Sequence, residues 1–255
     1  MMRRFNFWLV VLTMVWVGAP VAGADTITLA ADKYPPYNDV PESSKPGYVI
    51  EIADLVFSKA GHAVKYVVVP WTRAIEKTRE GEYNGIIANF RNDAPDFVFP
   101  DNEVGQCAFC FFAPRNSAWR YKGIDSLKGR KIATIRGYTY TAELDPYLKD
   151  NPDVESTFGE DALEKNIKKM IAGRVDLVIE DKYVFLAAAN RLGVEPDAYM
   201  NVGALNADQA VYISFGPNNP KSLEYARILS DGVDGLRASG ELSRILMKYG
   251  LSDWK

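Results

Sequence analysis

Histidine and cysteine are scarce in this sequence, whose 255 residues include one histidine and two cysteines. A single histidine excludes a zinc site built from several histidines and a proton relay between two of them. His62 follows the end of a predicted helix, where we expect it at the surface. We expect no bound metal and no cofactor.

Cys107 and Cys110 have the CxxC spacing of redox enzymes, yet they lie inside an apolar run that indicates a strand. Reactive cysteines of this kind usually sit at a helix N-terminus. Side chains three residues apart in a strand point to opposite faces, which strains a direct bridge. We therefore predict two buried free thiols, and a disulfide across a local bulge is the alternative.

Blocks of basic residues are absent as well, and the net charge of −3 is mildly acidic. This composition argues against a nucleic-acid partner. One long apolar run, Phe5 to Gly18, follows two arginines and precedes the small residues Ala22-Gly-Ala24. The pattern predicts a cleavable signal peptide over residues 1–24 and a mature chain in the periplasm, with an uncleaved signal anchor as the alternative. No later stretch approaches the roughly 18 to 20 apolar residues that span a bilayer.

One pattern occurs twice, ninety-two positions apart, at residues 81–89 and 173–181. Each copy has a glycine after a helix-like run, an Asn or Asp three residues later, three apolar residues, and a polar residue eight positions after the glycine. Each predicts an amphipathic helix that ends at a glycine, followed by a short buried strand. Ligands of open α/β sheets bind at the carboxyl ends of strands, so Asn89 to Arg91 and Asp181 are candidate binding residues in two halves of the chain. A positive and a negative group facing each other suit a small zwitterion.

Predicted strands and helices alternate along the mature chain, which is typical of parallel βαβ units and predicts an α/β protein. In each half we expect a sheet built from such units and flanked by helices. The predicted strands cover residues 27–31, 63–69, 86–89, 131–135, 154–158, 175–179 and 210–215, and the predicted helices cover residues 48–60, 72–80, 141–148, 161–172, 183–192, 223–238 and 241–249.

Two interruptions of this alternation divide the chain into lobes. The apolar segment Val104 to Ala113 predicts a strand that leaves the first lobe, and Gly216 to Pro220 precedes helices that should return to it. Lobe one then comprises residues 25–114 and 216–255, and lobe two comprises residues 115–215. Two crossover strands form a hinge that permits closure without unfolding either lobe. A single continuous doubly wound sheet is the alternative.

Several motifs occur in order across the mature chain: Tyr34-Pro-Pro-Tyr37, Gly47, residues 80–88, Leu127-Lys-Gly-Arg-Lys131, residues 173–181 and residues 240–249. Together they resemble the periplasmic solute-binding proteins of bacterial ABC importers for polar amino acids, extracellular solute-binding family three. Trp71-Thr-Arg73 looks like a divergent subgroup of that family. The resemblance implies a two-lobed fold that closes on a small molecule, a monomeric protein, and an inner-membrane ABC permease as its partner.

The resemblance further implies an arginine that holds the ligand carboxylate and an aspartate that binds the ammonium group. Arg91 suits the first role because a guanidinium binds a carboxylate with two parallel hydrogen bonds; a surface salt bridge with Asp93 or Asp96 is the alternative. This chain departs from the family pattern, since Asn89-Phe-Arg91 is shorter and its arginine comes earlier. Asp181 suits the second role. Adjacent strand residues face opposite sides, so only one of Glu180 and Asp181 can face the cleft, and Asp181 holds the same position in its copy of the repeated pattern as Asn89 does in the other. A helix N-cap is the alternative for Asp181.

The remaining candidates lie in predicted loops. Tyr138 and Thr139 belong to the segment 137–141, which follows a strand and opens a helix, so its N–H groups could bind an anion. A simply capped helix is the alternative. Tyr34, Tyr37 and Trp71 lie in turns after strands, where a ring can stack on an apolar or cationic part of a ligand. Rings that only cover loop edges are the alternative.

We therefore expect a binding protein and not an enzyme. It should capture a small polar solute, such as an amino acid or a related zwitterion or carboxylate, and deliver it to the permease. Two alternatives stay open on the same fold, because fold does not determine function. One is a ligand-sensing subunit of a membrane receptor. The other is a periplasmic dehydratase-like enzyme in which Glu180 or Asp181 transfers a proton.

Overall fold

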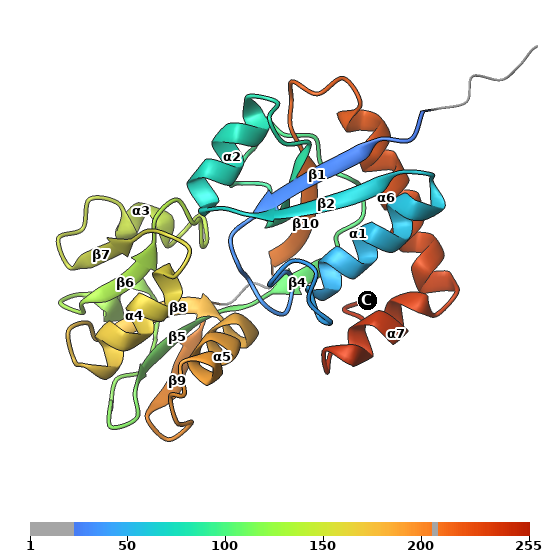
Figure 1. Cartoon of the computed structure of the whole chain (residues 1–255). Helices are drawn as coiled ribbons and strands as arrows, with labels where there is room; N and C mark the ends of the chain where they lie inside the picture. The colour runs from blue at the N-terminus through green and yellow to red at the C-terminus, as the bar shows by residue number, and fades with distance from the viewer. Residues whose placement is uncertain (1–22, 206–208) are drawn as a thin grey trace, which may run out of the picture.

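The computed structural model describes residues 23–205 and 209–255. The expected signal peptide, residues 1–24, lies outside the described residues except for its last two. Two five-stranded sheets form two lobes, and helices flank each sheet (Figure 1). The predicted α/β fold with two lobes is confirmed, and a single continuous sheet is excluded.

The first lobe is built from β1 (Thr26–Ala31), α1 (Tyr48–Lys59), β2 (Ala63–Val68), α2 (Trp71–Arg79), β3 (Gly85–Asn89), β4 (Gly105–Cys107), β10 (Gln209–Phe215), α6 (Ser222–Ala238) and α7 (Glu241–Lys248). Its strand order is β2-β1-β3-β10-β4. The first three strands are parallel because helices connect them, whereas β10 runs antiparallel to both of its neighbours. Helices α6 and α7 pack against α1, so the C-terminal helices do return to this lobe.

The second lobe is built from β5 (Phe109–Pro114), a 3-10 helix (Ile124–Leu127), β6 (Ile132–Ile135), α3 (Asp145–Leu148), β7 (Val154–Thr157), α4 (Ala162–Ile171), β8 (Leu177–Asp181), α5 (Lys182–Arg191) and β9 (Tyr199–Ala204). Its strand order is β7-β6-β8-β5-β9. The two copies of the repeated pattern therefore hold the same place. Each supplies the third parallel strand, β3 or β8, beside an antiparallel strand.

The chain crosses between the lobes earlier than the expected boundaries at 114/115 and 215/216. β4 pairs in the first sheet and β5 in the second, so Val104 to Ala113 forms two strands separated by Ala108. β10 pairs in the first sheet, although the sequence analysis assigns its residues to lobe two. An apolar run predicts burial in a strand, but its periodicity carries no information about which sheet it joins.

Two further elements differ from the prediction. The helix expected over residues 141–148 is limited to Asp145–Leu148. Pro146 explains this, because it has no N–H to donate to the carbonyl of Ala142 in a longer helix, whereas the first turn of a helix tolerates proline. Strand β9 was not predicted, because its sequence, with Asn201 and Gly203, lacks the apolar pattern of a buried strand.

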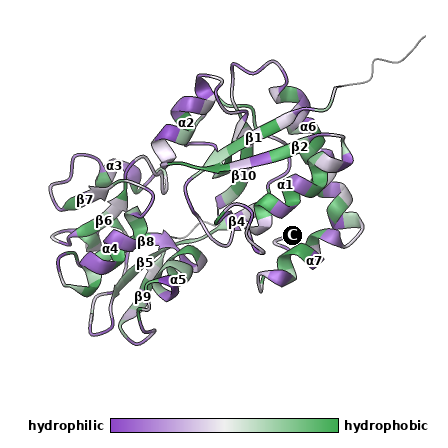
Figure 2. Ribbon diagram, in the orientation of Figure 1, coloured by the Kyte–Doolittle hydropathy of each residue, from purple (hydrophilic) through white to green (hydrophobic). Residues whose placement is uncertain are grey.

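Hydrophobic faces of the helices cover both sheets. Figure 2 shows hydrophobic and hydrophilic residues alternating along the helices. In α4 the buried face includes Leu163, Ile167 and Met170, at the three- and four-residue spacing of one helix face. No helix in the described ranges is long and apolar enough to cross a membrane.

His62 is buried, with 6% of its surface exposed, so the prediction of a surface position is wrong. Its Nδ1 accepts a 3.2 Å hydrogen bond from the backbone N–H of Asp25, and its ring meets Phe57 and Tyr225 edge-on. The turn after α1 folds this side chain back between the start of β1 and α6. The prediction for the cysteines is confirmed, because Cys107 and Cys110 are buried and free.

Candidate ligand-binding site

The two lobes are in direct contact. The hydroxyl of Tyr138 in lobe two donates a 2.8 Å hydrogen bond to Oδ2 of Asp32 in lobe one. Gly137 brings this loop close to the start of α2, because a Cβ at Gly137 would lie 2.6 Å from Cγ2 of Thr72. Its φ of +84° also favours glycine. The structure therefore represents a closed arrangement of the lobes.

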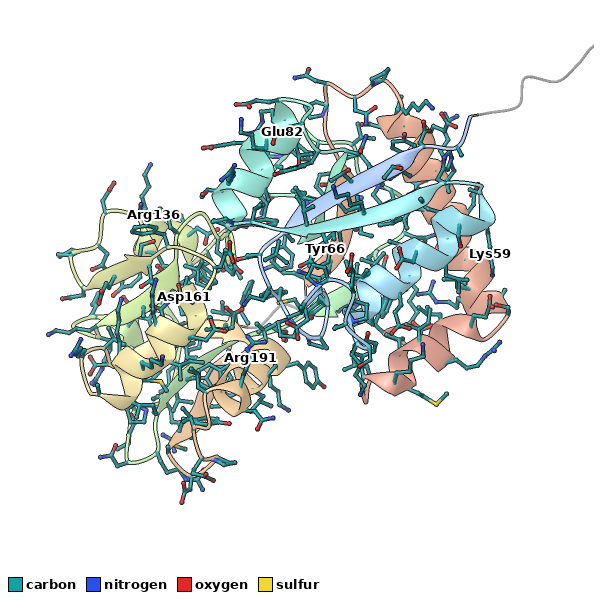
Figure 3. The ribbon with its side chains drawn as sticks, in the orientation of Figure 1. Lys59, Tyr66, Glu82, Arg136, Asp161 and Arg191 are labelled. Carbon is teal, nitrogen blue, oxygen red and sulfur yellow. The ribbon has the colours of Figure 1, made fainter. Side chains whose placement is uncertain are left out.

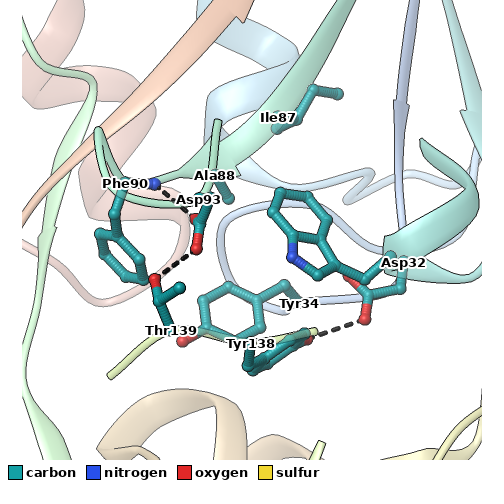
Figure 4. A pocket seen from close by; sticks show the side chains of 9 residues that line it. Asp32, Tyr34, Ile87, Ala88, Phe90, Asp93, Tyr138 and Thr139 are labelled. Atoms are coloured by element: carbon teal, nitrogen blue, oxygen red, sulfur yellow. Dashed lines mark hydrogen bonds between the residues drawn. The ribbon is translucent and has the colours of Figure 1, made fainter. Parts of the chain in front are cut away.

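A cavity lies between the lobes (Figure 4). Lobe one contributes most of its wall, and lobe two contributes the loop after β6. The lining residues are Asp32, Tyr34, Trp71, Ile87, Ala88, Phe90, Asp93, Tyr138 and Thr139. In lobe one these residues follow β1 and β2 or lie at the end of β3, so the cavity sits at the carboxyl ends of parallel strands, where ligands of α/β sheets bind.

Aromatic rings form much of the cavity wall. The rings of Tyr34 and Tyr138 are 6.1 Å apart between centroids and nearly perpendicular, at 77°. Trp71 meets Tyr138 in the same way, at 6.2 Å and 81°. Trp71 is the first residue of α2 and follows Pro70, which starts the helix at the sheet edge. The perpendicular rings enclose the space from different sides.

Two aspartates of lobe one complete the wall. Asp32 follows β1 and is buried, and Oδ2 of Asp93 accepts a 2.8 Å hydrogen bond from the N–H of Phe90. The hydroxyl of Thr139 donates to Oδ1 of Asp93. Burial raises the pKa of Asp32 to about 7 and that of Asp93 to about 6, although these hydrogen bonds act in the opposite direction. No lysine or arginine is among the described residues that line the cavity.

A second compartment adjoins the first and shares Asp32, Tyr34 and Tyr138 with it. Glu180 lies in its wall and is fully buried. Its carboxylate accepts one hydrogen bond of 2.8 Å, from the N–H of Asp181, and Oε2 has no hydrogen-bond partner in the described structure. Burial, reinforced by the negative charge of Asp181, raises the pKa of Glu180 well above its usual value. Burial thus favours the neutral, protonated form of this group.

The second compartment, unlike the described wall of the first, has basic side chains in its wall. Lys33 and Arg191 are among its lining residues. Arg191 projects from α5 (Figure 3) and is paired with Glu164 at 2.7 Å and with Asp39 of lobe one at 3.5 Å. Its charge is thus already compensated.

The structure brings four of the eight predicted site residues together at the first cavity: Tyr34, Trp71, Tyr138 and Thr139. The other four, Tyr37, Asn89, Arg91 and Asp181, lie outside its wall. Contact with a ligand stays a prediction for all eight.

A β-bulge explains the position of Asn89. Ile87 pairs with Ile213 and Asn89 pairs with Tyr212, so Ala88 is an extra residue in β3, with a φ of +57°. The bulge changes the alternation of side chains. Asn89 points into lobe one, where its Nδ2 donates a 2.9 Å hydrogen bond to Ser214, and it is fully buried. Asn89 and Asp181 hold the same position in the two copies of the repeated pattern, but the bulge means that their side chains do not point in equivalent directions.

Arg91 lies on the exposed surface of lobe one, outside the cavity. Its guanidinium stacks over the rings of Phe99 and Tyr212, at 5.0 Å and 4.6 Å from their centroids. Its Nη2 donates a 3.4 Å hydrogen bond to the carbonyl of Pro100. The alternative of a salt bridge with Asp96 is not realised either, because Asp96 pairs with Arg79 at 2.7 Å.

Asp181 caps α5. Its Oδ1 accepts hydrogen bonds from the N–H groups of Tyr183 and Val184, at 2.8 and 3.2 Å. Its Oδ2 accepts from the N–H of Ala108, at 3.3 Å, and from the hydroxyl of Tyr37, at 3.5 Å. The N-cap alternative thus accounts for this side chain, which faces the crossover between the lobes. Tyr37 lies on the same side and also donates to the carbonyl of Gln106 at 2.6 Å.

The loop before α3 does not form the expected anion-binding helix end. The helix starts only at Asp145, and the N–H of Tyr140 donates to the carboxylate of Asp145 at 2.8 Å. The N–H of Tyr138 donates to the carbonyl of Ile135 at 3.2 Å. A loop whose donors meet an acidic side chain offers little to an anion.

Sequence reasoning did not name Asp32, and it named Asp93 only as a possible salt-bridge partner of Arg91. The rule that selected Asp181, a carboxylate at the end of a strand, also applies to Asp32, which directly follows β1. The cavity position of Phe90 depends on the bulge at Ala88, for which the sequence carries no comparable signal.

No protein-family model matches this chain, and no curated protein matches it in sequence. Solved structures do match it. A histidine kinase sensor domain with similarity to periplasmic binding proteins aligns with a TM-score of 0.74 and 21% identity, over 89% of this chain and 98% of that one. A structure from work on glutathione import via GshT and the cystine ABC importer TcyBC of Streptococcus mutans aligns with a TM-score of 0.74 and 20% identity, over 90% and 97%.

A third similar structure is ArtJ of Geobacillus stearothermophilus, an arginine-, lysine-, histidine-binding protein. It aligns with a TM-score of 0.73 and 16% identity, over 90% of this chain and 97% of that one. The chain therefore has the two-lobed fold of periplasmic binding proteins, as the sequence resemblance implies. Identities this low establish the fold alone, so function must be argued from the site.

Proposed function

We propose that this protein is an exported solute-binding protein that closes its two lobes around a small polar solute. The observation that carries the proposal is the cavity whose wall comes from both lobes, with Asp32 and Trp71 on one side and Tyr138 on the other. A ligand that touches both lobes binds the closed state better than the open one. It therefore drives closure by that difference in affinity.

The cavity has the features of a small-molecule site. Aromatic and other apolar side chains form most of its wall, with a few polar groups among them. A micromolar ligand needs about −8 kcal/mol of binding free energy. A few hydrogen bonds to charged groups, at about 1.5 to 3 kcal/mol each, together with ring contacts, can supply this after the entropic costs of binding.

The most direct role for such a protein is delivery of its solute to an inner-membrane ABC permease, from a monomer in the periplasm. ArtJ is described as an amino-acid-binding protein, and the Streptococcus mutans work concerns an ABC importer, which supports this role. One observation favours a second candidate: a histidine kinase sensor domain is among the similar structures. A sensor would use the same closure to signal to a membrane partner.

A ligand screen tests the proposal. The mature chain from Asp25, refolded to remove any bound solute, is melted in the presence of amino acids, small carboxylates, amines and polyamines, and sugars. We expect a shift of several degrees with one chemical class. Small-angle scattering should then show a smaller radius of gyration with that ligand.

Matched variants connect the shift to the cavity. Trp71→Ala should abolish it, whereas Phe158→Ala, at an exposed position outside the interlobe cavity, should preserve it. If no class shifts the melting temperature, the proposal fails. If the bound compound is consumed, the enzyme alternative replaces it.

A further inference from the structure

The interlobe cavity contains negative groups without a positive counterpart. Asp32 and Asp93 line it, and no basic side chain is among the described residues of its wall. Carboxylates in buried sites are normally paired with a cation or bound to a metal. Within the described ranges, no three His, Cys, Asp or Glu side chains come together as metal ligands.

The hydrogen bonds to these two aspartates all come from neutral donors. Asp32 accepts from the hydroxyl of Tyr138 at 2.8 Å. Asp93 accepts from the N–H of Phe90 at 2.8 Å and from the hydroxyl of Thr139. Neutral donors orient a carboxylate but leave its charge in place, so the site lacks a full positive charge.

The aromatic walls supply a second, independent feature. The rings of Tyr34 and Trp71 each lie nearly perpendicular to the ring of Tyr138, with centroids 6.1 and 6.2 Å from it. Faces of aromatic rings carry negative electrostatic potential and attract ammonium groups, and several rings around one space are typical of sites for organic cations. Rings and carboxylates therefore favour the same kind of ligand.

A third observation comes from the adjoining compartment. Oε2 of Glu180 is buried there without a hydrogen-bond partner, beside Asp32, Tyr34 and Tyr138. A buried polar atom without a partner is uncommon, and a ligand that extends past the tyrosines could supply one. Oε2 accepts a hydrogen bond when the carboxyl is ionised and donates one when it is protonated, so a ligand amine or hydroxyl could partner it.

We infer that the ligand of the interlobe cavity is a small organic cation, an amine or quaternary ammonium compound whose positive nitrogen lies between Asp32 and Asp93 within the aromatic walls, and that it carries no carboxylate. The inference rests on the proposed function. The sequence indicates a zwitterion, whose carboxylate would need a basic partner. Arg91 lies outside the cavity and no other basic group replaces it among the described residues of the wall, so the inferred ligand is a cation without a carboxylate.

The competing ligand is an anion or zwitterion held by Lys33. This lysine follows Asp32 and lines the adjoining compartment, while the other basic group there, Arg191, is paired with Glu164 and Asp39. The two ligand classes therefore depend on different side chains, and mutation can separate them.

The test uses titration calorimetry on the refolded mature chain at pH 8, where both aspartates are ionised. Ligands are compared in pairs that differ by a carboxylate: agmatine with arginine, cadaverine with lysine, and choline with glycine betaine. Glutamate and glucose represent anions and neutral solutes. We expect one of the carboxylate-free cations to bind at least about tenfold more tightly than its partner.

Variants then locate the charge. Asp93→Asn should weaken binding of that cation by at least about tenfold, since one charge-assisted contact is lost. Asp96→Asn is the matched control, because Asp96 pairs with Arg79 on the surface, and it should leave affinity unchanged. Lys33→Met should have no effect on a cation and a large effect on an anion.

The outcomes separate the inference from the proposed function. If an amino acid, glutamate or glucose binds best, or if Lys33→Met abolishes binding while Asp93→Asn does not, the inference is overturned and the solute-binding function stands. If no member of any class binds, the proposed function itself fails, and the inference fails with it.

Discussion

The hydroxyl of Tyr138 donates a 2.8 Å hydrogen bond across the interlobe boundary to Asp32. The tyrosine belongs to the loop after β6 in lobe two, and the aspartate follows β1 in lobe one. Both also line the cavity. Closure and ligand binding thus share one carboxyl group, and changes at this pair should affect both.

Tyr138→Phe removes this bond and keeps the ring. A hydrogen bond to a charged group contributes about 1.5 to 3 kcal/mol, so we expect the closed state to lose at least about tenfold in population relative to the open one. Ligand affinity should fall by a similar factor, and small-angle scattering at one sub-saturating ligand concentration should give a larger radius of gyration for the variant than for the wild-type protein. Tyr183→Phe is the control because Tyr183 is exposed on α5. Unchanged scattering and affinity would mean that other contacts hold the lobes together.

The stability of the ligand-free protein should rise as the pH falls from 8 to 5.5. Burial raises the pKa of Asp32 to about 7 and that of Asp93 to about 6, so the folded protein binds more protons than the unfolded chain between pH 4 and pH 7. Stability is therefore greatest below the unfolded pKa of about 4 for these groups and is lost as the pH rises through 6 and 7. The measurement is the melting temperature at constant ionic strength.

Asp32→Asn should flatten this pH dependence, since the amide does not titrate. Binding of an organic cation should show the opposite trend and weaken as the pH falls, because protonation removes the charge that it contacts. Carboxylates outside the cavity with lowered pKa values, such as Asp25 and Asp96, oppose the stability trend only near and below pH 4. A melting temperature that falls steadily from pH 8 to 5.5 would contradict the assignment of these two groups.

The fold could be predicted from the sequence because its signals are local and repeated. The glycine that ends a helix and the buried strand after it occur in both lobes, and they place β3 and β8 correctly. The local sequence pattern does not show which strands pair with one another in a sheet. The apolar segment after Val104 reads as one strand, yet β4 and β5 belong to different sheets.

Part of the site could also be predicted from local signals, because a residue that follows a strand can be recognised in the sequence. Loops after strands reach the cleft in any such fold, so Tyr34, Trp71 and Tyr138 could be selected. The direction of the Asn89 side chain could not be predicted, because the bulge at Ala88 changes the face of the strand on which Asn89 lies. A positive φ in a residue other than glycine is strained, and no sequence signal marks it here.

Arg91→Ala distinguishes the sequence-based assignment from the structural one. An arginine that holds the ligand carboxylate would lose at least about tenfold in affinity. The structure places its guanidinium over Phe99 and Tyr212 instead, so we expect less than about a twofold change in affinity and a loss of about 0.5 to 1 kcal/mol in stability. Calorimetry and urea unfolding measure the two quantities separately. A tenfold loss of affinity at unchanged stability would return Arg91 to the binding site.

Asp181 is the candidate for which two substitutions separate a structural role from a binding role. Asparagine is as good an N-cap as aspartate, whereas alanine cannot cap. Asp181→Asn should therefore change the free energy of unfolding by less than about 0.5 kcal/mol, and Asp181→Ala should lower it by about 1 to 2 kcal/mol. The alanine variant also removes the acceptor of the Ala108 N–H and the Tyr37 hydroxyl at the crossover between the lobes.

Ligand affinity completes this comparison. With Asp181 outside the interlobe cavity, Asp181→Asn should leave the affinity for every ligand class within about twofold. If it weakens ligands that carry an amino group and spares their analogues without one, the carboxylate binds the ammonium directly. The cap would then be a secondary role of Asp181, and the ligand would have to reach the crossover side of the cleft, where Tyr37 and Asp181 meet.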